Sequence, residues 1–314
     1  MACAYTAGEL SSLYYSKETT YGTTVAAMTA ALLSTSWQRQ DDKQRFRQYL
    51  PGSRSYDVNS SVDQGNDVAF SLAGVLRNNA AWAEPLISGA FGTGAAGNTV
   101  ESTDLLVLPS YSMLLRLGST VKGNLAEVLY NGCKVNSLTL NADSPRAVIT
   151  ASAVVFAQFA EKLATEKKVS ALQNLTLTVP DDPVATRPAA IQWSSGITIG
   201  TEIVYPVSWS LQVENNLGRT VGIAKGYDTK DYVVTKCLAE GQRSITLSTV
   251  LWFNDYKQIV DQLDNNIIGS VTIPISNAKS IKLTNCRYTL SLPEHVQDRH
   301  QITLNLDCAA ASVV

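Results

Sequence analysis

The sequence has little of what most enzymes and metal-binding proteins use. It holds 2 histidines and 5 cysteines in 314 residues. It contains no Cys-x-x-Cys pair, no Walker A loop and no Ser-His-Asp order. Five cysteines are too few for a disulfide scaffold in a chain of this length. Lys plus Arg number 25 and Asp plus Glu 27, giving a formal charge of −2. A protein that neutralises many phosphates is normally basic, so this balance disfavours avid DNA binding.

Long hydrophobic runs are also missing. The longest uncharged, apolar-leaning stretch, residues 147–160, is too short and too polar to cross a bilayer. The opening MACAYTAGEL lacks the basic and apolar regions of a signal peptide. With 45% apolar and 17% charged residues, the composition favours an ordered core. We therefore expect a soluble globular protein of a reducing compartment. We expect its cysteines to be buried free thiols: Cys3, Cys133, Cys237, Cys286 and Cys308.

Most of the chain has the two-residue periodicity of β-strands. Val68, Phe70 and Leu72 alternate with other residues in the stretch 64–76, and Ile302, Leu304 and Leu306 do so in 301–308. This alternation is typical of strands with one buried face. Turn-forming Gly, Asn, Asp and Pro separate the runs. We predict strands at residues 64–76, 147–156, 174–179, 243–251, 267–275 and 301–308.

Helical signals are few. Residues 255–263 place Tyr256, Ile259 and Leu263 at helical spacing, with Asn254 or Asp255 as a plausible N-cap. Residues 77–87 form a second, weaker candidate, and Pro85 weakens the end of this helix. Residues 156–169 form a third, with apolar residues on one side and charges on the other.

An internal repeat divides the chain. Short matches occur in the same order in both halves: Thr20–Thr23 with Thr198–Thr201, Ser36-Trp37 with Ser208-Trp209, Tyr56-Asp57 with Tyr227-Asp228, Gly65 with Gly241, and Cys133-Lys134 with Cys286-Arg287. Their common order favours tandem duplication over coincidence. We predict a first β domain at 1–178, a proline-rich linker at 179–188 and a second β domain at 189–314.

Two patterns that could indicate chemistry have simpler explanations. Gly92, Gly94 and Gly97 spell GxGxxG, but they follow a helix-like stretch, whereas a dinucleotide site needs a strand before the turn. His295 and His300, with Asp298, could hold a metal, but residues 293–299 are typical of a turn between two strands. We therefore expect no cofactor, no metal and no catalytic residue.

One polar stretch, residues 38–54, combines basic and aromatic residues. Nucleic acid binding is one interpretation. The equivalent stretch of the second half, 211–225, is not basic, which favours a protruding hairpin or loop that contacts another subunit. The candidate contact residues are Arg39, Lys43, Arg45, Phe46, Arg47, Tyr49, Asn215, Asn216 and Arg219.

A family resemblance follows from the order of these elements. Glu18-Thr19-Thr20-Tyr21-Gly22-Thr23 precedes a Trp-containing strand, a long loop, the Gly-led strand at 65–76, a helix and a late strand pair. In this order the sequence resembles the tail tube proteins of long-tailed bacteriophages. The resemblance implies a mainly β fold with two tandem tail-tube-like β-sandwich or half-barrel domains, each with a flanking α-helix. It also implies a structural virion protein that is assembled in the host cytoplasm.

The resemblance further implies self-assembly. Rings would stack into a hollow tube through which DNA passes into the host, with other tail proteins at the tube ends and no membrane partner. A duplicated chain could form each ring from three subunits with pseudo-sixfold symmetry; six subunits are the alternative. The lumen-facing sheets would then join into one barrel. Head-to-tail pairing would cover the open edges of each sheet, and the candidate contact residues would stack ring upon ring.

Two other classes remain open from the sequence. One is a different β-rich phage structural or adhesive protein, such as a baseplate, fibre or secretion-tube component. The other is an enzyme that uses Asp298, His295 or His300. Loss of turnover after their replacement by Ala would favour the enzyme, and carbohydrate or host-surface binding would favour the adhesive protein.

Overall fold

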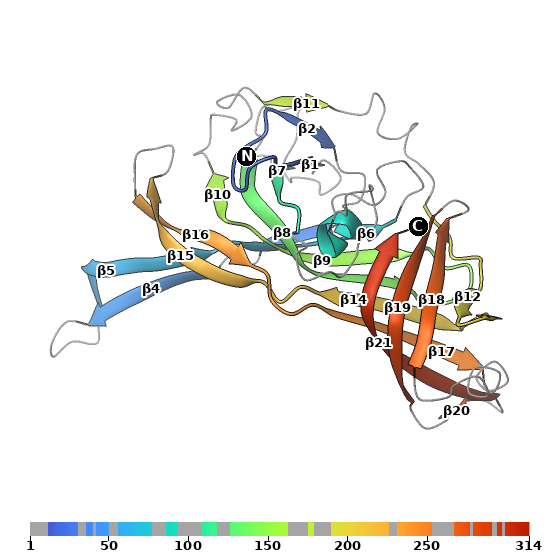
Figure 1. The fold of residues 1–314 in the computed structure, drawn as a ribbon. Coiled ribbons are helices and arrows are strands. Elements are labelled where there is room, and N and C mark those ends of the chain that lie inside the picture. The colour runs from blue at the N-terminus through green and yellow to red at the C-terminus, as the bar shows by residue number, and fades with distance from the viewer. Residues whose placement is uncertain are drawn as a thin grey trace, which may run out of the picture.

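The computed structural model of the chain describes residues 12–30, 36–39, 42–49, 56–76, 86–92, 108–117, 126–162, 175–178, 190–225, 231–252, 267–276, 279–290, 294–296 and 299–313. Over these residues the fold is mainly β. Figure 1 shows a broad, curved sheet from which two long hairpins project at one end, while the C-terminal strands lie at the other end. Within the described residues, helix is limited to α1 (Leu86–Phe91).

The strands of the first half are β1 (Ser12–Lys17), β2 (Ala27–Ala30), β3 (Ser36–Arg39), β4 (Asp42–Tyr49), β5 (Tyr56–Asp67), β6 (Ala69–Val75), β7 (Tyr111–Leu117), β8 (Ala126–Ala142), β9 (Thr150–Phe156), β10 (Phe159–Lys162) and β11 (Thr176–Thr178). Strand β8 is long enough to belong to two sets of pairs. Its first part pairs with β7 and β10, and its second part pairs with β9 and β14.

The strands of the second half are β12 (Ile197–Ile199), β13 (Glu202–Val204), β14 (Ser208–Glu214), β15 (Gly218–Lys225), β16 (Asp231–Ala239), β17 (Ser244–Trp252), β18 (Ile267–Ser276), β19 (Lys279–Leu290), β20 (Glu294–Val296) and β21 (Arg299–Val313). Together the two halves build one 17-stranded sheet, and the pairs β4–β5 and β15–β16 form two separate hairpins. The pairing in the large sheet is antiparallel except between β11 and β2.

The same order of neighbouring strands occurs in each half. In the first half the order is β2-β1-β7-β8-β9-β6-β3. In the second half it is β13-β12-β18-β19-β21-β17-β14. The registers also agree across four strands. Trp37, Leu72, Ala153 and Leu138 lie side by side in one half, as Trp209, Thr249, Leu304 and Leu290 do in the other.

The hydrophobic core runs through both halves without a break. One buried cluster includes Leu72 and Leu140 of the first half and Leu211 and Leu304 of the second. Every residue of α1 is buried, and the helix contacts β8 and β14 where the halves meet. The core and the sheet therefore show no clear split into two domains, and a flanking helix in each half stays a prediction.

The strand predictions are confirmed, since β6, β9, β11, β17, β18 and β21 occupy the predicted stretches. The Trp match of the repeat also lies on equivalent strands, β3 and β14. The Thr20 match does not, because Thr20 lies in a turn after β1, whereas Thr198 is within β12 and pairs with Ile203. The connection between β1 and β2 is longer than that between β12 and β13, so the two motifs occupy different places relative to these strands.

Among the described residues, the helix predictions are confirmed only at the end of residues 77–87, where α1 begins. The helix expected at 156–169 is wrong over Phe159–Lys162, which is strand β10 and pairs with β8. Hydrogen bonds along the edge of β8 outweigh the helical spacing of apolar residues. Helix α1 begins directly after Pro85, consistent with the preference for proline at helix starts. Residues 77–85, 163–169 and 255–263, and the linker at 179–188, lie outside the described residues.

Candidate assembly surfaces and channel face

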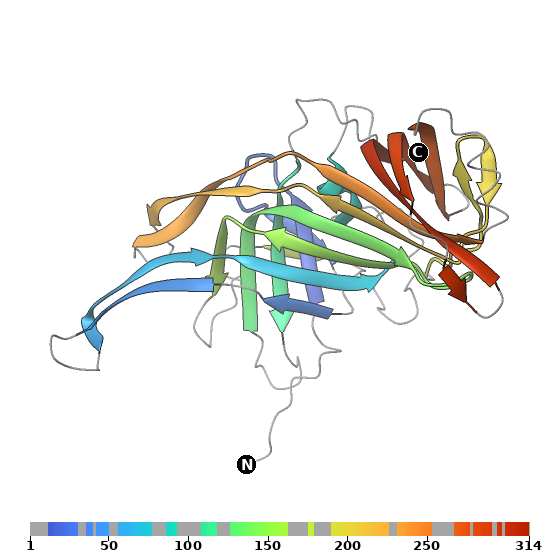
Figure 2. The ribbon, with the colours of Figure 1, turned by 90° about the horizontal axis from the view of Figure 1, so that it is seen from below.

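The sheet has one apolar face and one polar face. Along β8 and β14, Leu138 and Leu211 are buried, whereas Gln212 between the buried positions is exposed. The same alternation holds on β9 and β21, where Ser152 and Asn305 are exposed. Figure 2 shows these strands crossing the width of the molecule side by side. The polar face is therefore a broad surface to which each half contributes.

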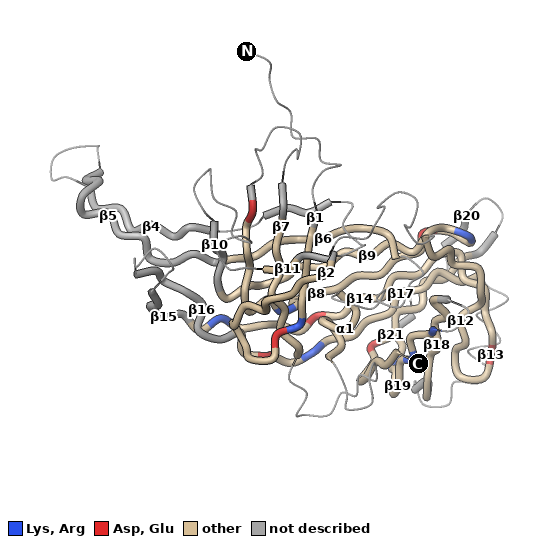
Figure 3. Tube along the Cα trace, turned by 90° about the horizontal axis from the view of Figure 1, so that it is seen from above, with Lys and Arg blue, Asp and Glu red and all other residues tan. Residues whose placement is uncertain are grey.

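Along its central strands, this polar face carries almost no positive charge. The six strands β6, β9, β14, β17, residues 137–142 of β8 and residues 301–313 of β21 contain no Lys or Arg. Their acidic residues are Glu214 and Asp307, and Arg287 on the neighbouring β19 lies opposite Asp307. Figure 3 shows long uncharged stretches along β6, β9 and β17. A surface of Ser, Thr, Asn and Gln offers few counter-charges to phosphates, so it binds DNA weakly.

The two halves are joined by pairing between β8 and β14. Six residue pairs run from Ser137 opposite Glu214 to Ala142 opposite Trp209. Beneath the joint, Trp209 contacts Trp193 edge to face with ring centroids 6.3 Å apart. The joint continues the sheet from one half into the other through backbone hydrogen bonds. The apolar side chains of β8 and β14 at the joint are buried, so it is also part of the hydrophobic core.

Five of the six predicted contact residues of the first half lie on a projecting hairpin, and the sixth, Arg39, lies in the large sheet. Arg39 ends β3, and β4 carries Lys43, Arg45, Phe46, Arg47 and Tyr49. In the pairing with β5, Arg45 lies opposite Asp63 and Tyr49 opposite Tyr56. The β15–β16 hairpin leaves the body at the same end as β4–β5, and β16 contacts β5 (Figures 1 and 2). We call these two hairpins the arms.

The predicted residues of the second half lie at the root of the other arm rather than along it. Asn215 is buried, and its amide nitrogen donates to the carbonyls of Ala90, at 3.0 Å, and Val135, at 2.9 Å. Its Oδ1 accepts from Arg243 Nε at 2.9 Å, and Arg243 Nη1 donates to Phe91 O at 3.0 Å. Asn215 therefore ties the arm to β8 and to the C-terminal end of α1.

Two further residues complete this root. Asn216 adopts a positive φ of 47°, and its amide donates to Gln242 O at 2.7 Å. Arg219 donates to Val68 O at 3.2 Å and lies over the ring of Phe156, 4.2 Å from its centroid. A guanidinium on an aromatic face is a favourable cation–π contact. Both residues therefore fix the direction in which the arm leaves the sheet.

Sequence reasoning missed Arg243 and the ion pair that lies near it. Burial lowers the pKa of Arg243, and the carboxylate of Glu240 opposes this shift. Glu240 Oε1 accepts from Lys134 Nζ at 2.8 Å and from Leu108 N at 2.8 Å. Strand β8 is thus bound by charge to the segment between β16 and β17. In the sequence, the one indication of this contact was the match of Cys133-Lys134 with Cys286-Arg287, which singled out the strand that carries Lys134.

The Glu18–Thr23 motif forms a turn whose first residue, Glu18, is buried. The Glu18 carboxylate accepts from Gly22 N at 2.8 Å, Ser112 Oγ at 2.8 Å and Gly132 N at 2.9 Å. Gly22 and Gly132 have positive φ, and a Cβ at either position would collide with Gln158. The motif therefore fastens β1 to β7 and β8, and its role in this chain is structural.

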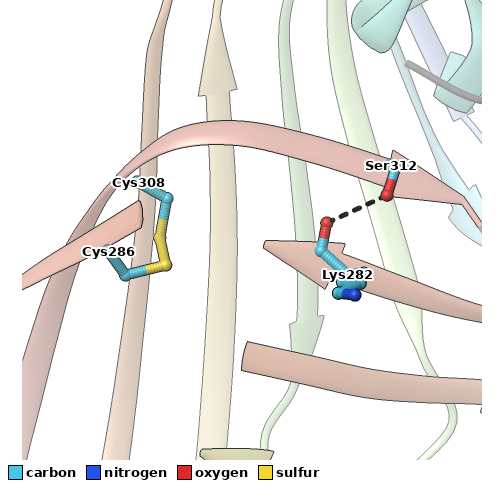
Figure 4. The surroundings of a disulfide bond; sticks show 4 residues. All are labelled: Lys282, Cys286, Cys308 and Ser312. Carbon is cyan, nitrogen blue, oxygen red and sulfur yellow. Dashed lines mark hydrogen bonds between the residues drawn. A yellow bond between two sulfur atoms is a disulfide. The ribbon is translucent and has the colours of Figure 1, made fainter. Parts of the chain in front are cut away.

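The cysteines differ from the expectation of free thiols. Cys286 and Cys308 form a disulfide between paired positions of β19 and β21 (Figure 4). Cys133 is free and buried, as predicted, and burial, with the nearby Glu18 charge, raises its pKa well above the ordinary value. Cys3 and the Cys237 side chain lie outside what the structure describes. A spacing pattern cannot reveal a disulfide that depends on strand register.

The weaker motifs gain little support from the geometry. His295 and His300 lie opposite each other in the short β20–β21 hairpin. No cluster of three or more His, Cys, Asp or Glu suited to a metal occurs among the described residues. Gly92 has a φ of 94° and its N–H donates to Ser88 O, so it ends α1 as a C-cap glycine. Gly94, Gly97 and Asp298 are not described. In the described part of the chain, no helix has the length and apolarity needed to span a membrane.

Together these features define a β-rich fold with an open sheet, one polar face and two projecting arms. The model of the phage tail tube protein family matches residues 8–306, and the chain belongs to this family. It is a structural, non-enzymatic component of the phage tail and of the virion, and proteins of this family self-assemble into the tube. No curated protein matches the chain.

Proposed function

We propose that the chain is a tandem duplication of a tube domain and that three chains form one ring of the tail tube, with pseudo-sixfold symmetry. The two domains would be residues 1–178 and 189–314, with 179–188 as the linker. The observation that carries this proposal is the neighbour order that occurs in both halves, with its matching registers across Trp37 and Trp209. Each half supplies one sixth of the ring.

The polar face of the sheet lines the channel through which the genome is delivered. Support comes from the absence of Lys and Arg on β6, β9, β14, β17, residues 137–142 and residues 301–313, and from the Ser, Thr, Asn and Gln side chains of these strands. Each neutralised phosphate releases counterions and strengthens binding, so basic residues here would hold the DNA back. The opposite face belongs to the continuous core and cannot face water.

The arms stack one ring on the next. They leave the body at the same end, and their strands extend past the large sheet. In this assignment, Arg39, Lys43, Arg45, Phe46, Arg47 and Tyr49 form the contact surface. Asn215, Asn216 and Arg219 act through the contacts that orient the second arm. At the ends of the tube, the same surfaces meet other tail proteins.

Cryo-electron microscopy of the purified chain tests this function. We expect hollow tubes of stacked rings, each with three chains and six similar lobes. Rings of six chains would contradict the three-subunit count. Single rings that never stack would favour a baseplate component, and a chain that stays monomeric at high concentration would contradict tube formation altogether.

A further inference from the structure

Five described strands of the large sheet pair with one neighbour only: β3, β10, β11, β13 and β20. Two of them, β3 and β20, have counterparts within the chain that are paired on both sides. Strand β3 pairs with β6, and β20 pairs with β21. Unpaired strand edges present backbone N–H and C=O groups that need partners. The edges of β3 and β20 belong to different halves of the chain, so a single chain leaves both of them open.

Their counterparts within the chain are paired with each other. By neighbour order, β14 corresponds to β3, because β14 lies beside β17 as β3 lies beside β6. The end of β8 corresponds to β20, because it lies beside β9 as β20 lies beside β21. The end of β8 and β14 form the joint between the halves. The chain therefore contains a complete example of the pairing that β3 and β20 lack.

We propose that β3 of one subunit pairs antiparallel with β20 of the next subunit, in the register of the β8–β14 joint. The partner is a second copy of this chain, and the inference rests on the proposed ring. Because the contact is head to tail, each subunit uses one edge of each kind, and a closed ring leaves no such edge open.

The register follows from matched positions. Asn141 lies opposite Ser210, and Ala142 opposite Trp209. Glu294 takes the place of Asn141, because Glu294 lies opposite Gln301 as Asn141 lies opposite Thr150. Gln301 and Thr150 are equivalent, since they pair with Trp252 and Val75 at matching positions. The new joint therefore places Gln38 opposite Glu294 and Trp37 opposite His295.

Disulfide cross-linking tests this register. Gln38→Cys together with Glu294→Cys puts thiols at facing positions, where a bridge is geometrically allowed. The matched control combines Gln38→Cys with Val296→Cys, two residues along the same strand, where diagonal neighbours lie about 7–8 Å apart. Single variants reveal any bridge to a native cysteine. Tubes are assembled under reducing conditions, checked by microscopy, oxidised and run on a non-reducing gel.

We expect the facing pair to give covalent dimers and a ladder that stops at the trimer, with at least tenfold less product from the control. A ladder that stops at six supports the joint but contradicts the three-subunit ring. Variants that form tubes without a cross-link, or that cross-link equally in the control, overturn the joint and leave the tube function intact.

A measurement on the unmodified chain covers the case in which the variants fail to assemble. Amide hydrogen exchange is compared between dispersed chain and tubes. We expect exchange at outward-facing amides of residues 36–39 and 294–296 to slow about tenfold or more in tubes, while β8 and β14 are equally protected in both states. Unchanged exchange in β3 and β20 overturns the proposal. A chain that forms no tubes contradicts the proposed function instead.

Discussion

The two halves have the same strand order, but different interactions stabilise it in each half. In the first half, β8 passes from Gly132 to the free Cys133, beside the buried carboxylate of Glu18. In the second half, β19 passes from Asn285 to Cys286, which is bonded to Cys308. Gly132 and Asn285 both have positive φ, at 63° and 51°. Strand order and the positive φ at this position are thus the same in both halves, whereas the polar and covalent links that stabilise them differ.

The largest expected effect is in the first half. Glu18→Ala removes the acceptor for two backbone N–H groups and the Ser112 hydroxyl, so we expect unfolding free energy to fall by about 3–5 kcal/mol. Urea denaturation of the dispersed chain measures it. Asp143→Ala, at an exposed carboxylate between β8 and β9, is the control and should change stability by less than about 0.5 kcal/mol. Equal losses of stability in the two variants would show that the Glu18 hydrogen bonds do not stabilise the first half.

The second half should depend on its disulfide instead. Cys286→Ser opens a link across a sequence separation of 22 residues. The chain-entropy relation gives a loss of about 3 kcal/mol. We expect reduction to lower the urea midpoint of the wild-type chain. The midpoint of the Cys286→Ser variant should not change on reduction, because its disulfide is already absent. A variant as stable as the oxidised wild type would remove this difference between the halves.

The matched positive-φ positions should respond unequally. Gly132→Ala strains the backbone and places a Cβ 2.7 Å from Gln158 Cβ, so we expect a loss of about 2–3 kcal/mol. Asn285→Gly keeps the conformation accessible and should stay within about 1 kcal/mol of wild type. Thermal unfolding of both variants measures the contrast. Similar losses would mean that Gln158 does not restrict the first position.

Substitutions on the polar face should have the smallest effect on stability, and the effect should be the same in both halves. Ser152 and Thr303 occupy equivalent positions on the polar face, since they pair with Ala73 and Val250 respectively. Ser152→Lys and Thr303→Lys should change stability by less than about 0.5 kcal/mol. Tubes carrying either lysine should retain DNA, with retention falling as salt rises. Ser152→Glu is the control, and retention by that variant would argue against a channel lining.

The sequence was informative where one physical pattern dominates. The placement of Val68, Phe70 and Leu72 at every second position located β6, and the Trp37 and Trp209 matches located strands with the same place in the neighbour order. It failed at Phe159–Lys162, because the edge of β8 decides that conformation and lies far away in sequence. The root of the second arm was predicted in part. Asn215 and Arg219 were selected from the sequence, but as residues that contact another subunit rather than as residues that orient the arm. Their partners, Ala90 and Val68, offer backbone carbonyls that carry no residue-type signal.

The joint between β8 and β14 lies within one polypeptide, and this has a kinetic consequence. Its two strands are tethered, so their encounter does not slow on dilution, whereas an encounter between separate chains does. In the proposed ring, half of the joints would form during folding of each chain and the other half on collision. Nucleation of a ring would then require three bodies to meet rather than six, and tube initiation should tolerate low subunit concentration accordingly.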